Sequence, residues 1–340
     1  MAFPSGGRDL SASTINKWIT KEGIVDNIYK SNAVLDTLKE TGKRQGKRGV
    51  PAQRSAFRVY NGGEFIQDAP ILNQSAASTN VTGDEVITSV AVDPLEKALW
   101  PVCLKGKIVQ ISEKDTMRNR GAAQMVDEEQ VRITEGLSRV MYDVNYDITA
   151  RSSLCGVSSY NGVNGLPGMI STSGTSGTET IAGITRASTL TGWLNQATTT
   201  CGAFATYYTK LTLQQAVCNG ASKAPMWNLL ITTPTVWAAM LNKFLGLGQV
   251  QLQNDKDPDT GYANFRWLGA KVVMDADITS GYVYGIPTED MWFYVDSERN
   301  FKVGEKFEPP DQFVYARKIK VACQLGFRRF SGVGVTTGWS

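Results

Sequence analysis

Two aspartates, Asp275 and Asp277, are the residues whose type and spacing first suggest chemistry. They lie in WLGAKVVMDADITSGYVYGIPTEDMWFYVD, which spans residues 267–296. Side chains two residues apart on a strand share one face, so the two carboxylates could hold a divalent metal or share a proton. However, DADITSG also suits a turn, because Asp and Ser side chains bond their own backbone and Gly accepts a positive φ. We favour the turn, since the chain has no histidine and the spacing suggests no third ligand.

A second acidic stretch, DKDPDTG at residues 255–261, resembles the start of a calcium-binding loop, with acids at its first, third and fifth positions. The resemblance fails further along the segment. The sixth position needs Gly for a sharp turn and is Thr260, and the twelfth needs a bidentate Glu and is Arg266. We therefore predict a solvated loop here and no metal site.

Motifs for nucleotide binding and nucleophilic catalysis are also missing. GKRQGKRG lacks the glycine spacing of a P-loop, and GVNGLPG lacks the spacing of a dinucleotide-binding turn. The absence of histidine removes the commonest general base and metal ligand, together with every Ser–His or Cys–His pair. The five cysteines are scattered and form no CxxC, as is typical of small buried hydrophobic residues. We predict no catalytic residue, no metal and no cofactor.

Composition indicates an ordinary globular protein. Apolar residues make up 42% of the 340 residues, which supports a large buried core. The net charge is only +3, from 35 basic and 32 acidic residues, so overall charge does not identify a nucleic-acid-binding protein. The start of the chain shows no secretory-signal pattern, and no apolar stretch approaches the roughly 20 residues of a membrane helix. We expect a soluble, intracellular protein with no membrane partner.

The clearest predicted helix spans about residues 121–151. At 1.5 Å per residue it is about 45 Å long, and it would form a one-sided spine with charged residues on its other side. Its apolar residues recur mostly three or four positions apart, which is the spacing of one helix face: Val126, Ile133, Leu137, Val140, Val144 and Ile148.

Other strands and helices follow from local patterns. Residues 55–112 indicate two strands separated by a long polar excursion, and a loop of that length is rare unless it has a function. WNLLITTPTVWAAMLNKFL indicates a strand, a turn and a helix, with Thr233 as the cap and Pro234 at the first helical position. Residues 267–296 indicate three strands, and another helix ends near Gly220. FVYARKIKVACQLGFRR alternates like a strand but also allows a helix.

One basic run stands above the background of charge. Glycine and proline interrupt it, so we predict an extended segment and no helix. It could be a solvated loop, or it could contact an acidic surface of another copy or nucleic acid. Its basic residues are Lys43, Arg44, Lys47, Arg48, Arg54 and Arg58.

Taken in order, these parts resemble the major capsid proteins of tailed double-stranded-DNA bacteriophages, the family with the Hong Kong 97 (HK97) shell fold. The order is an N-terminal arm, a long two-stranded excursion, a spine helix, a GLPG turn and the strand–helix unit LLITTPTVWAAML. The last hundred residues carry most of the resemblance, from NFRWLGAKVVMDAD to the paired Arg328 and Arg329. The resemblance implies an α+β HK97-like fold and a structural protein that is not an enzyme.

The resemblance also implies a division of the chain. Residues 1–50 would form the N-terminal arm, and residues 51–112 the extended β-hairpin loop that lies across a neighbouring subunit. Residues 113–192 together with 297–340 would form the peripheral domain around the spine helix. Residues 193–296 would form the axial domain.

Two sets of contact residues follow from that division. The basic run would contact a neighbouring subunit. A loop of the axial domain would lie near the capsomer axis, and its marked residues are Gly246, Gln249, Asp255, Asp257, Asp259 and Gly261.

The expected partners are further copies of the chain, arranged as pentamers and hexamers of an icosahedral virion shell around DNA that is confined non-specifically. A portal is implied, with a separate scaffolding protein or none, because no long charged coiled-coil region is present at the start; a decoration protein is a further option. Assembly would take place in the host bacterial cytoplasm. Three alternatives stay open: a compartment that encloses an enzyme within the same fold, a phage tail or surface adhesin, and an enzyme that uses Asp275 and Asp277.

Overall fold

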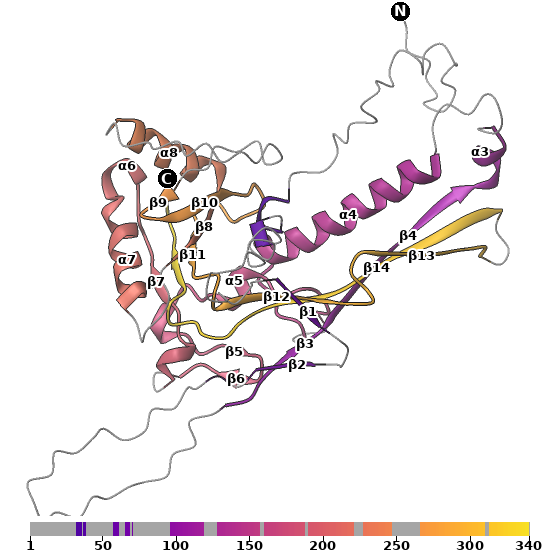
Figure 1. The fold of residues 1–340 in the computed structure, drawn as a ribbon. Helices are drawn as coiled ribbons and strands as arrows, with labels where there is room; N and C mark the ends of the chain where they lie inside the picture. Colours follow the sequence, from indigo (N-terminus) through magenta and orange to yellow (C-terminus); the bar gives the residue numbers. More distant parts are fainter. Residues whose placement is uncertain are drawn as a thin grey trace, which may run out of the picture. The chain divides into compact units, whose positions relative to one another are not determined.

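The structure is a computed structural model, and every structural statement below concerns the part of the chain that it describes (Figure 1). Of residues 57–60 only the backbone is described. The described residues are 32–35, 37–38, 57–60, 65–68, 70, 96–118, 128–156, 160–187, 190–220, 227–246, 266–309 and 313–339.

The chain divides into two compact units. Unit 1 contains Lys105–Asp143 and Glu298–Val321, together with residues 1–31, which lie outside the described part. Unit 2 contains Asn32–Leu104, Val144–Ser297 and Ala322–Ser340. The boundary passes through three continuous elements, the helix α4 and the strands β4 and β14. The four-part division expected from the resemblance is a different partition and stays a prediction.

Unit 1 is built on α4 (Glu128–Ala150), which confirms the predicted spine over its described residues; residues 121–127 lie outside them. The strands are β4 (Cys103–Ser112), β13 (Lys302–Phe307) and β14 (Val314–Phe327), and the short helix α3 (Glu113–Arg118) follows β4. Both β4 and β13 pair with β14. The ambiguous C-terminal segment is therefore a strand.

The helix α4 lies close to this sheet because Gly136, on the helix, presents no side chain to the strands. A Cβ at Gly136 would lie 2.6 Å from Cγ2 of Val109 on β4 and 2.7 Å from Cδ1 of Ile319 on β14. The ribbon shows α4 running along these two strands (Figure 1). Alternate residues of β4, including Lys105 and Lys107, contact the helix, and the residues between them are exposed. One face of the sheet is covered, and the other is open.

Unit 2 contains a mixed sheet with the strand order β7-β15-β11-β8-β10-β9. Its strands β8 and β10 are parallel, whereas β11 is antiparallel to β8. The strands are β7 (Gln196–Thr198), β8 (Leu229–Thr232), β9 (Arg266–Trp267), β10 (Ala270–Met274), β11 (Val283–Ile286) and β15 (Gly334–Thr336).

Helices cover this sheet. They are α6 (Phe204–Tyr207), α7 (Thr209–Gly220) and α8 (Pro234–Gly246). The predicted helix end at Gly220 and the predicted start at Pro234 are both confirmed, and the carbonyl of Thr233 accepts the N–H of Trp237 at 2.9 Å. The Thr233 hydroxyl lies 3.1 Å from that of Thr235.

The core of this sheet is organised by Trp227. Its ring occupies the space that side chains at Gly285 and Gly334 would need, and a Cβ at either position would lie 2.4 Å from it. Its Nε1–H donates to the carbonyl of Gly332 at 2.7 Å. Glycines on two neighbouring strands thus let an indole lie flat on the sheet.

A second group of elements completes unit 2. The strand β12 (Met291–Asp296) is parallel to β1 (Phe57–Tyr60) and antiparallel to the second half of β14. The strands β2 (Phe65–Asp68) and β3 (Ala98–Pro101) pair antiparallel on either side of residues 69–97. The prediction of two strands over residues 55–112 is wrong, because the described part of this range contains four, β1, β2, β3 and β4, and β2 lies in the segment predicted to be a polar excursion. The remaining elements are β5 (Thr180–Ile181), β6 (Ile184–Thr185), α5 (Leu166–Met169), η3 (Gly174–Ser176) and η4 (Thr191–Trp193).

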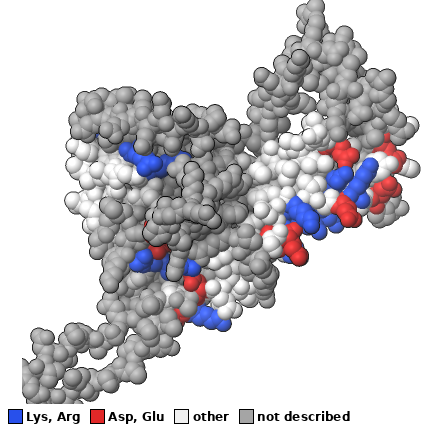
Figure 2. Space-filling model, in the orientation of Figure 1, with Lys and Arg blue, Asp and Glu red and all other residues white. Residues whose placement is uncertain are grey.

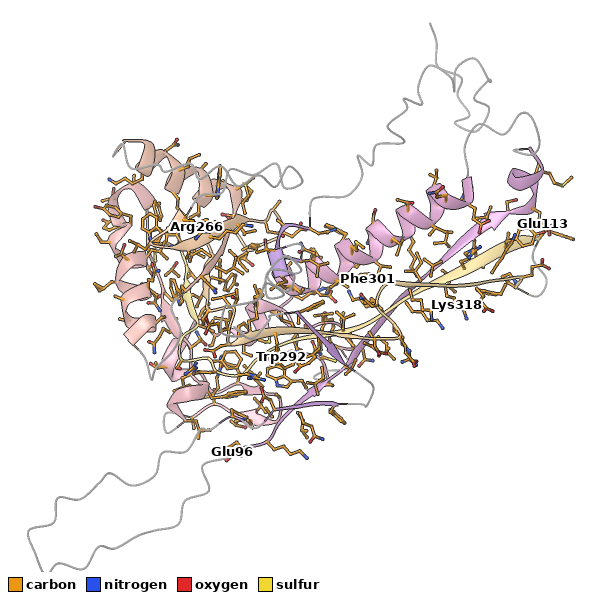
Figure 3. The ribbon with its side chains drawn as sticks, viewed as in Figure 1. Glu96, Glu113, Arg266, Trp292, Phe301 and Lys318 are labelled. Atoms are coloured by element: carbon orange, nitrogen blue, oxygen red, sulfur yellow. The ribbon has the colours of Figure 1, made fainter. Side chains whose placement is uncertain are left out.

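An aromatic cluster forms the core of this second group (Figure 3 labels Trp292). Trp100, Trp193 and Trp292 are fully buried. The ring centroid of Trp100 lies 6.3 Å from that of Trp193 and 5.3 Å from that of Trp292. The guanidinium of buried Arg186 lies 4.9 Å from the ring centroid of Phe330, and it donates to the backbone carbonyls of Met169 and Trp193. This cation is therefore fully accommodated inside an aromatic core.

Candidate functional site

The acidic pair that suggests chemistry in the sequence forms a structural turn. Asp275 is only 3% exposed, and its Oδ1 accepts the backbone N–H of Asp277 at 2.9 Å. Its Oδ2 accepts Nδ2–H of Asn145 at 2.8 Å, and Oδ1 of that Asn accepts the N–H of Leu35 at 3.2 Å. The predicted turn is confirmed, because both carboxylate oxygens bind groups of the protein itself. Within the described ranges, no cluster of three or more potential metal ligands occurs.

The cysteines also behave as the sequence predicts. All of them lie within the described ranges and form no disulfide, and Cys155 is the partly exposed one; the buried ones are Cys103, Cys201, Cys218 and Cys323. Burial raises the pKa of the Cys218 thiol to about 12. A thiol with so high a pKa is inert at neutral pH, so it serves packing.

The residues predicted to contact other subunits lie mostly outside the described part. This holds for Lys43, Arg44, Lys47, Arg48 and Arg54, and for Gln249, Asp255, Asp257, Asp259 and Gly261. Gly246 is the last residue of α8, and the backbone of Arg58 pairs with Tyr294 between β1 and β12. The contact roles of both sets stay predictions.

Charged side chains on the helix of unit 1 are matched in pairs. Glu129 binds Arg317 at 2.7 Å, Glu135 binds Lys107 at 2.9 Å, and Asp143 binds Arg139 at 3.0 Å. Basic and acidic groups accordingly interleave over this part of the surface (Figure 2). All of these side chains are at least partly exposed, and exposed pairs contribute only about 0–1 kcal/mol each. The pairs of Glu129 and Glu135 join α4 to β14 and β4 and so fix the position of the helix on the sheet, whereas Arg139 and Asp143 both lie on α4.

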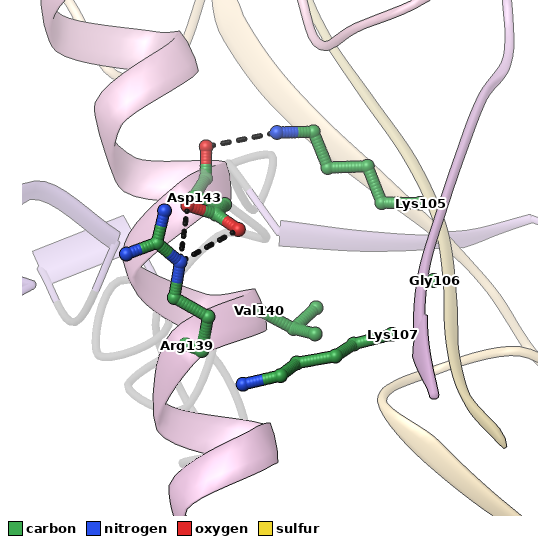
Figure 4. A pocket seen from close by; sticks show the side chains of 6 residues that line it. All are labelled: Lys105, Gly106, Lys107, Arg139, Val140 and Asp143. Carbon is green, nitrogen blue, oxygen red and sulfur yellow. Dashed lines mark hydrogen bonds and ion pairs between the residues drawn. The ribbon is translucent and has the colours of Figure 1, made fainter. Parts of the chain in front are cut away.

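A hollow of about 530 Å³ lies between β4 and α4 in unit 1 (Figure 4). Lys105, Lys107, Arg139 and Asp143 line it, and Nζ of Lys105 donates to the backbone carbonyl of Asp143 at 2.9 Å. Every cation at the hollow already has a carboxylate or carbonyl partner. The hollow is therefore a gap under bridging side chains and has no cation left to attract an anion.

The face of the unit 1 sheet that the helix leaves open carries lysines. Lys302 of β13 lies directly opposite Lys320 of β14, and both are exposed. Nζ of Lys318 lies 4.9 Å from the ring centroid of Phe307, and exposed Ile108 comes from β4. This face combines positive charge with unburied apolar surface.

The helix α7 of unit 2 contributes Leu211 and Cys218 to the core but also exposes an apolar stripe. Gln214 and Gln215 are buried, whereas Leu213, Ala216 and Val217 are exposed at the i, i+3, i+4 spacing of one helix face. The surface over α6 and α7 is mostly uncharged in Figure 2. An apolar stripe on the outside of a helix is typical of a surface that another protein covers.

Sequence reasoning missed both this stripe and a second exposed apolar group on unit 1. Phe313, just before β14, is 85% exposed and Met117 of α3 is 69% exposed. Periodicity predicts that apolar residues share a face, but it does not say whether that face is buried. In α7, the adjacent Gln214 and Gln215 between Leu213 and Val217 were the one sequence signal that these apolar side chains do not lie on a purely apolar, buried face.

The comparisons with known proteins identify the fold. No family model matches the chain, and no curated protein matches it by sequence. Among solved structures, the cyanophage A-1(L) capsid asymmetric unit matches with a TM-score of 0.67 at 15% identity, over 94% of this chain and 96% of that chain. The capsid of an empty GTA particle matches with a TM-score of 0.57 at 10% identity, over 94% of each chain. The capsid of Myoviridae phage XM1 matches with 0.53 at 10% identity, over 95% and 97%.

The chain therefore has the α+β, HK97-like fold of phage capsid proteins, as its sequence resemblance implies. The similarity extends over nearly the whole length of each partner. Within the described residues, no helix is both long and apolar enough to cross a membrane.

Proposed function

We propose that this chain is the major capsid protein of a tailed bacteriophage. Copies assemble as pentamers and hexamers into an icosahedral head that encloses double-stranded DNA, and the role is structural. The observation that carries the proposal is the match of fold over more than nine tenths of the chain to the capsid of cyanophage A-1(L). Fold alone does not define function, so the surface must also suit assembly.

The exposed apolar stripe on α7 supports assembly independently of fold. Exposure of Leu213 and Val217 to water is unfavourable, and this cost is removed only if another chain covers the two side chains. Large obligate interfaces bury apolar side chains of this kind. A closed shell buries such surfaces on every copy.

The charge of the chain suits a container for DNA. A net charge of +3 is small for 340 residues, so the shell would confine DNA without clamping its phosphates. The exposed Lys302, Lys318 and Lys320 offer weak, sequence-independent contacts. Strong phosphate binding would oppose both packaging and release.

The division into arm, extended loop, peripheral domain and axial domain belongs to this proposal. The hairpin β2–β3 would be the base of the extended loop over residues 51–112, and the loop after Gly246 would lie at the capsomer axis. A portal, and a scaffolding or decoration protein, are the further partners proposed, with assembly in the host cytoplasm.

The experiment is expression of the full chain in bacteria, alone and with the other head proteins of its genome, followed by electron microscopy. We expect closed icosahedral particles that contain nuclease-protected DNA when packaging proteins are present. Particles that enclose a protein and never DNA would indicate an enzyme compartment. A small species that binds a glycan or receptor would indicate an adhesin, and both results would reject the proposal.

A variant sharpens this test. Replacing Lys43, Arg44, Lys47 and Arg48 by Glu should leave folded subunits that fail to form shells, because the lost contacts lie between chains. Replacing the exposed Lys302, Lys306, Lys318 and Lys320 by Glu makes the same change in net charge and is the matched control, and we expect it to assemble. Normal particles from the first variant would contradict the contact role of the basic run.

A further inference from the structure

We propose that the end of unit 1 that carries Phe313 docks into an uncharged, partly apolar pocket in unit 2 of a second copy of this chain. The inference rests on the proposed function, because it assigns one contact of the shell. The contact joins an apolar protrusion of one copy to the pocket of another.

The protrusion is held in place while its side chains stay exposed. Phe313 has the highest exposure, 85%, of the large apolar side chains in the described residues. Its backbone carbonyl accepts the N–H of Glu113 at 3.1 Å, and Glu113 begins α3 (labelled in Figure 3). Met117, 69% exposed, lies one turn further along α3. A fixed backbone that presents two apolar side chains loses little entropy when it binds.

The pocket has a volume of about 740 Å³ and lies in unit 2, beside β3, the start of β4 and the β5–β6 hairpin. None of the described residues that line it is charged. Phe65 and Leu104 at the pocket are exposed, and buried Trp100 has no hydrogen-bond partner for its Nε1. Its apolar lining includes Phe65, Trp100, Leu104, Leu154 and Ile181, with Cys155 beside them.

The chemistry of the pocket selects the occupant. The described lining carries no charged side chain to bind DNA phosphates, and its apolar part suits phenylalanine and methionine side chains; its polar side chains are Asn161, Asn164 and Thr180. A small apolar ligand would fill the pocket but would leave Phe313 and Met117 in water. A second copy buries both surfaces at once.

The arrangement of the two surfaces suits a shell. A protrusion and a pocket at different places on one chain form a heterologous contact, which repeats from copy to copy and closes into a ring when the rotation allows. Pentamers and hexamers are rings of this kind. The same pair of surfaces could also join neighbouring rings.

Cysteine crosslinking tests the contact, because Cys155 already lies at the pocket. Phe313→Cys would place a thiol on the protrusion of the full chain. In assembled particles treated with diamide, the two sulfurs join; two electrons and two protons pass to diamide, which becomes the hydrazine. We expect a ladder of covalent oligomers on a non-reducing gel, which a reductant removes.

Two variants control this result. Phe313→Cys combined with Cys155→Ser should give no ladder, and neither should Leu213→Cys, which places a thiol on α7. Particles that form without a Phe313→Cys ladder would overturn the inference and leave the proposed function standing. An equal ladder from Leu213→Cys would also overturn it. Failure of the wild-type chain to form particles would reject both.

A second measurement uses assembly itself. Phe313→Asp should lower the yield of closed particles at least about tenfold, because a charge replaces an apolar anchor, and Phe313→Leu should stay within about twofold of the wild type. Circular dichroism of the subunits should be unchanged, because the side chain is exposed in the single chain. Wild-type yield from Phe313→Asp would overturn the inference.

Discussion

The two units of this chain bury their residues to very different extents. Unit 2 encloses a cluster of three tryptophans and a second core around Trp227, so its sheets are covered by its own side chains. The described part of unit 1 is a helix on a three-strand arrangement, held by exposed ion pairs, with one sheet face open. Unit 2 can stabilise itself, whereas unit 1 has little apolar burial of its own and exposes Phe313 and Met117.

This difference teaches where the chain depends on other copies. Apolar burial dominates folding free energy, while exposed ion pairs contribute little. Substitutions in the buried cores of unit 2 should therefore act on the free energy of unfolding of the single chain. Substitutions of the exposed apolar side chains Phe313 and Met117 of unit 1 should act mainly on assembly.

The largest effect is expected in the aromatic core of unit 2. Trp292 packs against Trp100 and against Gly326 on the paired strand β14. Trp292→Ala should reduce the free energy of unfolding by about 3–5 kcal/mol, because it leaves a cavity the size of an indole. Urea unfolding of the isolated chain measures the loss. A loss below about 1 kcal/mol would mean that this core does not stabilise unit 2.

A smaller effect is expected at the buried turn. Asp275→Ala should cost about 2–3 kcal/mol, because it removes two hydrogen bonds and leaves Nδ2 of Asn145 without its acceptor. Asp277→Asn is the matched control, since the turn uses the backbone N–H of that residue. Equal losses from the two variants would show that the turn does not depend on the Asp275 carboxylate.

The packing of α4 on the sheet of unit 1 is tested by placing a side chain at Gly136. Gly136→Val should destabilise by about 1–3 kcal/mol, because the new side chain meets Val109 and Ile319. Hydrogen exchange should rise in β4 and α4 of unit 1 and stay unchanged in the core around Trp227. Uniform loss of protection in both units would show that they unfold together, and would weaken the comparison.

The smallest effect concerns pH. Burial acts to raise the pKa of the Glu179 carboxyl, but hydrogen bonds from Ser171 and from its own backbone, with the charge of Arg186, outweigh burial and leave the pKa below 4.5. A lowered pKa means that this stabilisation is complete above the unfolded value and is lost as pH falls through the folded one. Glu179→Gln should therefore flatten the acid side of the stability profile as pH falls below the ordinary pKa of a glutamate, as measured by urea midpoints. An unchanged slope would contradict this role.

The elements of the fold were largely predictable because they depend on local patterns. The spine helix, the helix start at Pro234 and the Asp275 turn follow from spacing, capping and turn chemistry within a few residues. The assignment of strands to sheets was not predictable from these local patterns. β11 and β12 look alike in sequence, yet β11 pairs with β8 and β12 pairs with β1 and β14.

The contact surfaces were the least predictable, for a physical reason. Leu213, Val217 and Phe313 are residue types that usually lie in a core, and only the fold shows that their side chains are exposed. The β14 segment was ambiguous because lysines alternate with apolar residues on a strand with one open face. Pairing with β13 and β4 settles it as a strand.

The mass of the purified full-length chain in solution tests the central claim most directly. Mass photometry and sedimentation over a range of protein concentrations would report it. The account predicts a cooperative transition to particles of many copies, which Phe313→Asp suppresses without unfolding the subunit. A single species with the mass of one chain at every concentration, in the presence of the other head proteins as well, would contradict it.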